Sequence, residues 1–227
     1  MNHTLSTEVE QAGRDLRYLL NRGYQRKSLA GLLKLVGDRY GLDARQRTIL
    51  AKAVYGDEEA LRRRMKLIGP QDIVGRALGV DGYNVLVTIE SAFRRELLLL
   101  GDDGLVRDVA GQSSGYRPGP YTMPALNLLV EVLRLYPPQE TVLLFDMRMS
   151  RSRELSRSVT ELLQATGLRG GAATSPYPDR ELLQYQIVAS SDSALVDASA
   201  RAFDLAGYVA TQKLRLEPVH LSGRTAH

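Results

Sequence analysis

The spacing of hydrophobic residues changes along the chain and divides it into two regions. From Glu8 to Met65 apolar residues recur every three or four positions, as in Leu16, Leu19 and Leu20. This is the spacing of helices that bury one side. Glycines interrupt the pattern at intervals and indicate where the helices end. The first region therefore predicts a compact bundle of three or four short helices.

From Ile73 onward, short apolar runs alternate with helical patterns, which is typical of a parallel sheet with helical crossovers. The predicted strands are 76–81, 141–146, 187–190 and 208–216. The predicted helices lie within 84–98, 123–136, 152–166 and 193–206. The stretch 101–121 is expected to be irregular or a hairpin, and the Gly- and Pro-rich stretch 170–178 a loop. Right-handed crossovers would place helices on both faces of this sheet.

These patterns predict an α/β fold with a Rossmann-like parallel sheet, preceded by a small all-helical domain. We expect a helical domain over residues 1–68, an α/β domain over 73–217 and a disordered tail over 218–227. Gly69 and Pro70 mark the linker, because the residue before a proline disfavours the helical conformation.

Positive charge is concentrated in the helical region. Residues 1–66 hold 14 Lys and Arg against 8 Asp and Glu, whereas the remainder holds 16 against 18. A basic module favours a polyanionic partner, with nucleic acid, and RNA in particular, as the first expectation. An Arg-rich, solvated helical surface is the equally open alternative.

The residue types restrict the chemistry. The chain has no Cys, and its His residues are His3, His220 and His227, near the two ends. Disulfides, Cys-bound zinc and thiolate catalysis are therefore excluded, and carboxylates are the expected working groups. The longest aliphatic run, 97–100, is far shorter than the roughly 20 residues of a membrane span. We expect a cytoplasmic protein without a membrane partner, and the sequence leaves open whether it forms a homodimer.

Three acids follow strand-like runs: Asp81, Asp146 and Asp192. Open parallel sheets bind ligands at the carboxyl ends of their strands, so these acids are expected to converge there. Clustered carboxylates repel one another unless a hard cation such as Mg²⁺ or Mn²⁺ neutralises them. The three are therefore predicted to be catalytic and to bind the metal. Asp197 is a further candidate ligand, and Glu90 is a second-rank candidate.

Neighbouring polar residues complete the predicted site. Asn84 is expected to orient Asp81 or a substrate phosphate, and the expected substrate-binding residues are Arg148, Ser150, Arg151, Arg153 and Ser191. Arg forks and helix N-terminal amides both favour phosphate. Each acid also has a structural alternative. Asp81 could form an ordinary turn, Asp146 could pair with a nearby Arg, and Asp192 could cap a helix.

The segments 81–85 and 187–193, with the strand that ends at Asp146, resemble the acidic strand ends of PIN-like nucleases, especially their NYN branch. The resemblance covers about residues 76–216. It implies a Rossmann-like fold, Mg²⁺ or Mn²⁺, and cleavage of RNA. In it, Asp81 matches the first metal-binding acid, Asn84 its amide partner and Asp192 the late acid. Ala194 stands where many relatives carry another acid.

The whole chain, with segments 16–24 and 36–40 in front, also resembles a prokaryotic family catalogued as domain of unknown function four-three-four. This resemblance is the more specific of the two, and it implies no activity. The leading hypothesis from the sequence is a metal-dependent endoribonuclease, a hydrolase whose basic helical domain binds the RNA backbone. The alternative is a nonhydrolytic RNA-binding or scaffold protein. A phosphatase with Asp146 as nucleophile is more distant, because no second acid follows two positions later.

Overall fold

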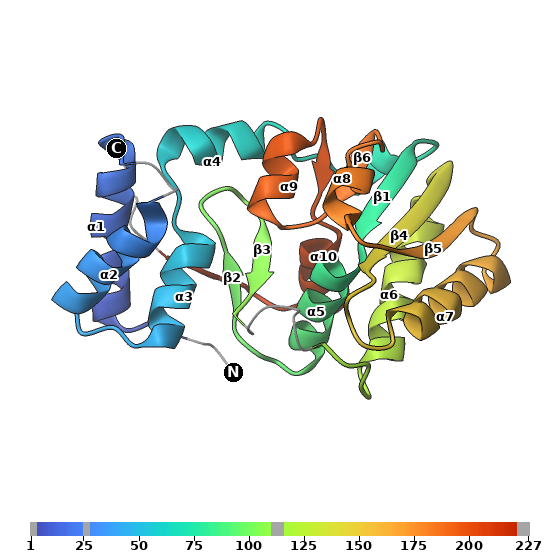
Figure 1. Ribbon diagram of the computed structural model, residues 1–227, viewed down its shortest axis with the longest axis horizontal. Helices are drawn as coiled ribbons and strands as arrows, with labels where there is room; N and C mark the ends of the chain where they lie inside the picture. The colour runs from blue at the N-terminus through green and yellow to red at the C-terminus, as the bar shows by residue number, and fades with distance from the viewer. Residues whose placement is uncertain (1–3, 25–27, 110–115, 222–227) are drawn as a thin grey trace. The chain divides into compact units, whose positions relative to one another are not determined.

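A computed structural model of the 227-residue chain describes residues 4–24, 28–109 and 116–221. These residues form two compact units (Figure 1). Unit 1 comprises Met1–Met65, Arg95–Val109 and Glu217–His227, and unit 2 comprises Lys66–Arg94 and Ala110–Leu216. No helix in the described part of the chain is long and apolar enough to cross a bilayer.

Unit 1 contains the predicted helical bundle. Its four helices are α1 (Thr7–Asn21), α2 (Leu29–Arg39), α3 (Ala44–Ala53) and α4 (Asp57–Arg64). Asp43 caps α3, because its carboxylate accepts the backbone amide of Gln46 at 2.7 Å and the Gln46 side-chain oxygen accepts the backbone amide of Asp43 at 2.9 Å. The apolar side of α1 is buried at Leu16, which packs with Leu50 and Val54. The helical prediction is confirmed for this region.

The sequence predicts an all-helical domain here, and this prediction is wrong for unit 1. Unit 1 also contains a sheet ordered β3-β2-β8, formed by β2 (Leu98–Leu100), β3 (Val106–Asp108) and β8 (Val219–His220). Strand β8 lies within the segment that was expected to be a disordered tail. Leu99 and Leu221 are buried in the same core as the helices, so burial of apolar surface holds these short strands in place.

Unit 2 is an α/β unit with a parallel sheet, as predicted, and the sheet has five strands in the described residues. The order is β5-β4-β1-β6-β7, and the strands are β1 (Ala77–Asp81), β4 (Glu140–Asp146), β5 (Gly170–Ser175), β6 (Ile187–Ala189) and β7 (Ala202–Phe203). The register places Asp81 beside Leu144 of β4, and Val80 beside Ala189 of β6. The carboxyl ends of the three central strands therefore lie together.

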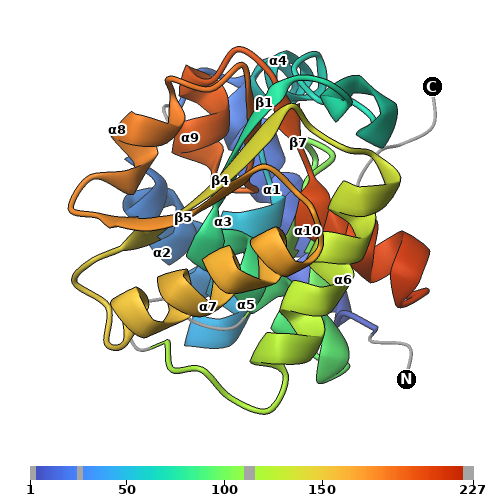
Figure 2. The ribbon, with the colours of Figure 1, turned by 90° about the vertical axis from the view of Figure 1, so that its right-hand side faces the viewer.

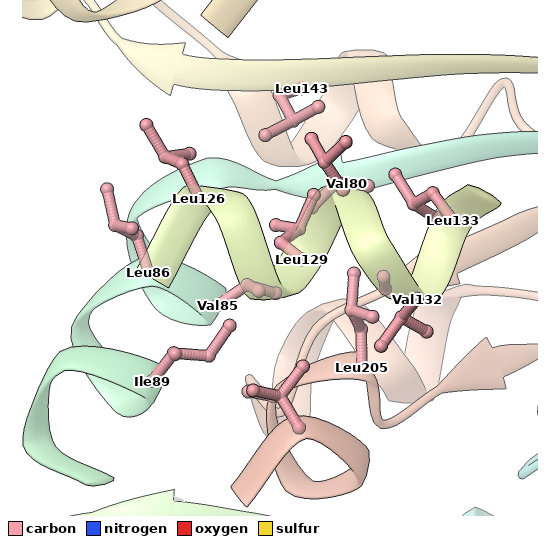
Figure 3. Packing of buried hydrophobic residues seen from close by; sticks show 14 of the residues in the cluster. Val80, Val85, Leu86, Ile89, Leu126, Leu129, Val132, Leu133, Leu143 and Leu205 are labelled. Carbon is pink, nitrogen blue, oxygen red and sulfur yellow. The ribbon is translucent and has the colours of Figure 1, made fainter. Parts of the chain in front are cut away.

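Helices cover both faces of this sheet (Figure 2). The helices of the larger layer are α5 (Gly82–Phe93), α6 (Thr122–Leu135), α7 (Ser152–Ala165) and α10 (Leu205–Tyr208). Val80 and Leu143 from the strands pack there against Leu129 of α6 (Figure 3). The other face carries α8 (Pro178–Leu182) and α9 (Ser193–Ala198), which pack through Leu182 and Leu195.

Four segments of unit 2 differ from the sequence prediction. Residues 208–216 do not form a strand, because α10 continues into η4 (Val209–Lys213), a π-helix that buries Val209 and Ala210. The expected loop at 170–178 contains the edge strand β5. The predicted helix 193–206 is divided into α9 and β7. A short helix, η2 (Pro70–Ile73), occupies the expected linker.

Candidate functional site

The candidate site lies at the carboxyl edge of the sheet in unit 2, where β1 separates β4 from β6. Connections run in opposite directions from β1, and this switch point is where open α/β sheets bind ligands. Side chains alternate along a strand, so Asp81 shares the face of Gly79 and Asp146 shares the face of Leu144. Leu144 packs against α8 and α9. Asp81 and Asp146 are therefore directed to the α8 and α9 side.

Asp81 is the central acid of the site. It ends β1 and caps α5, where its carboxylate accepts the Asn84 amide at 3.4 Å, and Ser190 donates its hydroxyl to Asp81 at 2.9 Å. Burial raises the pKa of Asp81 to about 7 despite the Ser190 hydrogen bond, and the charge of Asp179 adds to the rise. No Lys, Arg or His in the described residues forms an ion pair with this carboxylate.

Asn84 joins α5 to the loop after β6. Its side-chain oxygen accepts the Ser191 amide at 2.8 Å and the Ser191 hydroxyl at 3.1 Å. Ser191, which the sequence predicted to bind substrate, is buried and donates both of these hydrogen bonds to Asn84. The Asn84 side-chain nitrogen donates to no described residue and remains available to a ligand.

Sequence reasoning missed one acid of the site, Asp179. It lies in the first turn of α8. Because Gly79 of β1 has no side chain, Leu182 of α8 and Tyr185 can pack closely on the strand, where a Cβ atom would clash with them. Burial raises the pKa of Asp179, and the charges of Asp192 and Asp146 raise it further. The Gly- and Pro-rich sequence of segment 170–178 predicts a loop. The signal that could have indicated a helix start here is Pro178 followed directly by the acid Asp179.

Asp192 takes the position that the sequence assigned to the late acid. It follows β6 and caps α9, with its carboxylate accepting the Leu195 amide at 2.9 Å. Its charge raises the pKa values of both Asp81 and Asp179, which places the three carboxylates in one electrostatic cluster. Asp197, further along α9, is not among the charges that shift the pKa of Asp179. Its backbone oxygen accepts a hydrogen bond from Lys66.

Asp146 forms the ion pair that the sequence left open as an alternative. The Arg148 guanidinium binds both carboxylate oxygens, at 2.5 Å from Nη2 to Oδ2, and this bond holds the pKa of Asp146 low. The charge of Arg148 also acts on Asp179, where it lowers the pKa of the carboxyl and opposes the larger effect of burial. Arg151 and Arg153 are exposed at the start of α7, and so is Ser150 in the preceding turn.

The second-rank candidate Glu90 belongs to a separate structural network. It is 5% exposed, and one carboxylate oxygen accepts hydroxyls of Tyr116 and Thr122, each at 2.6 Å. Arg94 approaches its other oxygen at 3.4 Å. Every partner of Glu90 is thus a buried or neighbouring protein group, and it is not one of the charges that shift Asp179.

The donor chemistry fits a hard divalent cation. Asp81, Asp179 and Asp192 offer carboxylate oxygens that form no ion pair with a Lys, Arg or His among the described residues. Burial raises the pKa values of Asp81 and Asp179, and repulsion from neighbouring carboxylates raises them further. No group of three or more His, Cys, Asp or Glu in the described residues is arranged to hold a metal ion by itself. Mg²⁺ commonly binds through one or two carboxylates and completes its coordination with water and substrate phosphate.

The protonation of Asp81 predicts a pH dependence of stability. Between its ordinary pKa of 3.8 and about 7, the folded protein holds a proton on Asp81 that the unfolded chain has lost. The protonated Asp81 therefore stabilises the fold fully below pH 3.8. This stabilisation is lost as the pH rises from 3.8 to about 7 and stays lost at higher pH. Urea unfolding in EDTA should show Asp81→Asn gaining stability relative to wild type between pH 5 and pH 8. An equal difference at both pH values would contradict the prediction.

Comparison with known proteins places both regions of the chain. Residues 70–208 match a family described as "Domain of unknown function (DUF5616)", and residues 8–66 match "Protein of unknown function (DUF434)". A protein of Methanocaldococcus jannaschii, "Uncharacterized protein MJ0935", is 30% identical over 188 residues, which cover 83% of this chain and 88% of that protein. No solved structure matches. The chain therefore belongs to the DUF5616 family and carries an N-terminal DUF434 region.

Proposed function

We propose that unit 2 is a PIN-like domain of the NYN type and that the protein is a metal-dependent endoribonuclease. One observation supports this proposal most. Asp81, Asp179 and Asp192 lie in one electrostatic cluster at the switch point of a parallel sheet, and none of them forms an ion pair with a Lys, Arg or His among the described residues. Such a cluster is electrostatically costly in a protein without a ligand, and a divalent cation with an RNA phosphate would relieve it.

Each residue has a distinct task in this proposal. Asp81 and Asp192 would hold Mg²⁺ or Mn²⁺, and Asn84 would donate its free amide to a phosphate oxygen. When bound, the ion supplies Lewis-acid stabilisation of the phosphate and activation of water. Asp179 has a raised pKa and is suited to accept the proton of the attacking water. The water oxygen bonds to phosphorus, the bond to the leaving ribose oxygen breaks, and that oxygen takes up a proton.

Arginines around α7 would hold the RNA backbone. Arg151 and Arg153 are exposed near the strand end that carries Asp146. Arg148 would exchange part of its contact with Asp146 for a phosphate, since guanidinium forks bind both groups in the same way. Asp146 in this arrangement tunes the Arg148 side chain and has a smaller part in holding the ion.

Unit 1 would add non-specific backbone contacts, through fewer residues than its composition suggests. Arg17 pairs with Asp102, Arg63 is buried, and Arg47 donates to the backbone oxygens of residues 33, 34 and 42. The segment 95–109 also adds four acids against two Arg. The exposed cations that remain at the surface of the described helices include Arg14, Arg22 and Arg45.

A nonhydrolytic RNA-binding protein is the second candidate. The observation that favours it is the Arg148 ion pair, which neutralises Asp146, one of the acids expected to bind the metal. The same ion pair argues against a phosphatase with Asp146 as nucleophile, because the guanidinium occupies both carboxylate oxygens.

Cleavage of end-labelled RNA tests the proposal. Purified protein should cut RNA with Mn²⁺ or Mg²⁺ and not with EDTA. Asp192→Asn should lose this activity, whereas Asp197→Asn, the matched control on the same helix, should keep it. RNA that is bound but never cut under any metal condition would favour the nonhydrolytic protein. Equal loss in both variants would contradict the assignment of Asp192 over Asp197.

A further inference from the structure

An exposed aromatic ring stands beside the carboxylate cluster. Tyr177, between β5 and α8, is 69% exposed, although burial of a tyrosine ring is normally favourable. Met147, directly after β4, is 41% exposed. The Met147 amide donates to the backbone oxygen of Ser175 at 2.9 Å, so the segments that carry both side chains are joined at the carboxyl edge.

The backbone at Tyr177 is fixed. Its amide donates to the hydroxyl of Ser175 at 2.9 Å, and that hydroxyl, which is buried, donates to the carboxylate of Glu181 at 2.5 Å. Pro178 follows as the first residue of α8, and the Tyr177 oxygen accepts the Glu181 amide at 3.2 Å. The ring is therefore presented to solvent from a rigid turn, which reduces the entropy lost when a ligand binds.

The surroundings of Tyr177 match a nucleotide. Arg148 lies within electrostatic reach of both Tyr177 and Asp179, and it forms the ion pair with Asp146. An aromatic face, a thioether and a guanidinium thus lie next to acids that would hold a metal and a phosphate. Bases stack on exposed aromatic rings whatever their sequence, because every base has a π-face. In a duplex both faces of an internal base are already covered by its neighbours.

We propose that Tyr177 stacks on an unpaired base next to the phosphate at the carboxylate cluster, so that the substrate is single-stranded RNA. This proposal rests on the proposed function for the identity of the ligand. It adds a specificity-determining residue and excludes a fully paired duplex as the preferred substrate.

Binding in EDTA tests the stacking separately from cleavage. A fluorescently labelled, unstructured oligoribonucleotide and its duplex are titrated with wild type, Tyr177→Ala and Tyr177→Phe. Tyr177→Ala should bind the single strand roughly 5- to 150-fold more weakly, the cost of removing one stacked base, and Tyr177→Phe should bind as wild type does. Duplex binding should be the same for all three. Tyr121→Ala, which removes another partly exposed tyrosine of unit 2, should leave both affinities unchanged.

The outcomes separate the two proposals. Equal affinity of Tyr177→Ala and wild type for the single strand, equal losses for single strand and duplex, or no single-strand binding by wild type would each overturn the stacking proposal. Cleavage in Mn²⁺, measured in parallel, reports on the nuclease itself. Tyr177-dependent binding without metal-dependent cleavage would support stacking and overturn the nuclease. Each variant should unfold at the same temperature as wild type, which is the control that the substitutions leave the fold intact.

Discussion

Asp81→Asn is expected to cut RNA at least ~100-fold more slowly than wild type, since loss of even an outer contact to a metal ligand costs about 10- to 100-fold. The same variant should unfold at an equal or higher temperature at pH 8. Asparagine keeps an oxygen for the Asn84 amide and removes a negative charge that burial and Asp179 make unfavourable. Most substitutions at a half-buried position lower both quantities, so this combination of opposite effects is diagnostic.

Cleavage rates in saturating Mn²⁺ and melting curves in EDTA measure the two effects. Asp197→Asn provides the control, with unchanged rate. Addition of Mn²⁺ should raise the melting temperature of wild type at pH 8 and not that of Asp81→Asn, because ligand binding to the folded state stabilises it. A variant that melts well below wild type at pH 8 would show that Asp81 is a structural carboxylate and that its charge is compensated.

Asp103→Ala is expected to destabilise unit 1 by about 3–5 kcal/mol, the usual cost of removing one partner of a buried ion pair. Asp103 is fully buried, and its two oxygens bind Arg107 at 2.8 and 2.7 Å and Arg63 at 3.1 Å. Both guanidinium groups lie over the Tyr55 ring, at 4.6 and 5.1 Å from its centroid. Without Asp103, the like-charged Arg63 and Arg107 beside that ring would lose the carboxylate they share, while Glu59 would still bind Arg63.

Urea denaturation of the full chain, followed by circular dichroism, measures this loss. Glu58→Ala is the matched comparison, since it breaks an exposed pair with Arg62 and should cost less than about 1 kcal/mol. Losses of similar size in the two variants would mean that the buried cluster adds no more than a surface pair does.

The acids at the strand ends could be predicted because the strands before them are recognisable in the sequence. β1, β4 and β6 contain apolar runs that a buried parallel sheet requires, and the acids Asp81 and Asp146 end two of them. Asp179 could not be predicted in the same way. It follows β5, an edge strand with the sequence Gly-Gly-Ala-Ala-Thr-Ser, which buries little and carries no apolar run.

The sheet of unit 1 was missed for a different reason. β2 and β8 are short, and the pairing of Leu99 with Val219 joins positions far apart in the chain. Local periodicity does not report such pairings, because nothing near either segment specifies its partner. The C-terminal residues also follow Pro218 and are mostly polar, so their composition favours a tail.

The pairing of β8 with β2 also affects the order in which the chain can fold during synthesis. Unit 1 opens the sequence, yet one strand of its sheet, β8, and the buried Leu221 are supplied by residues after 216. Every strand of the α/β unit is synthesised before those residues are added. The helical unit, first to be translated, is therefore the last to be completed.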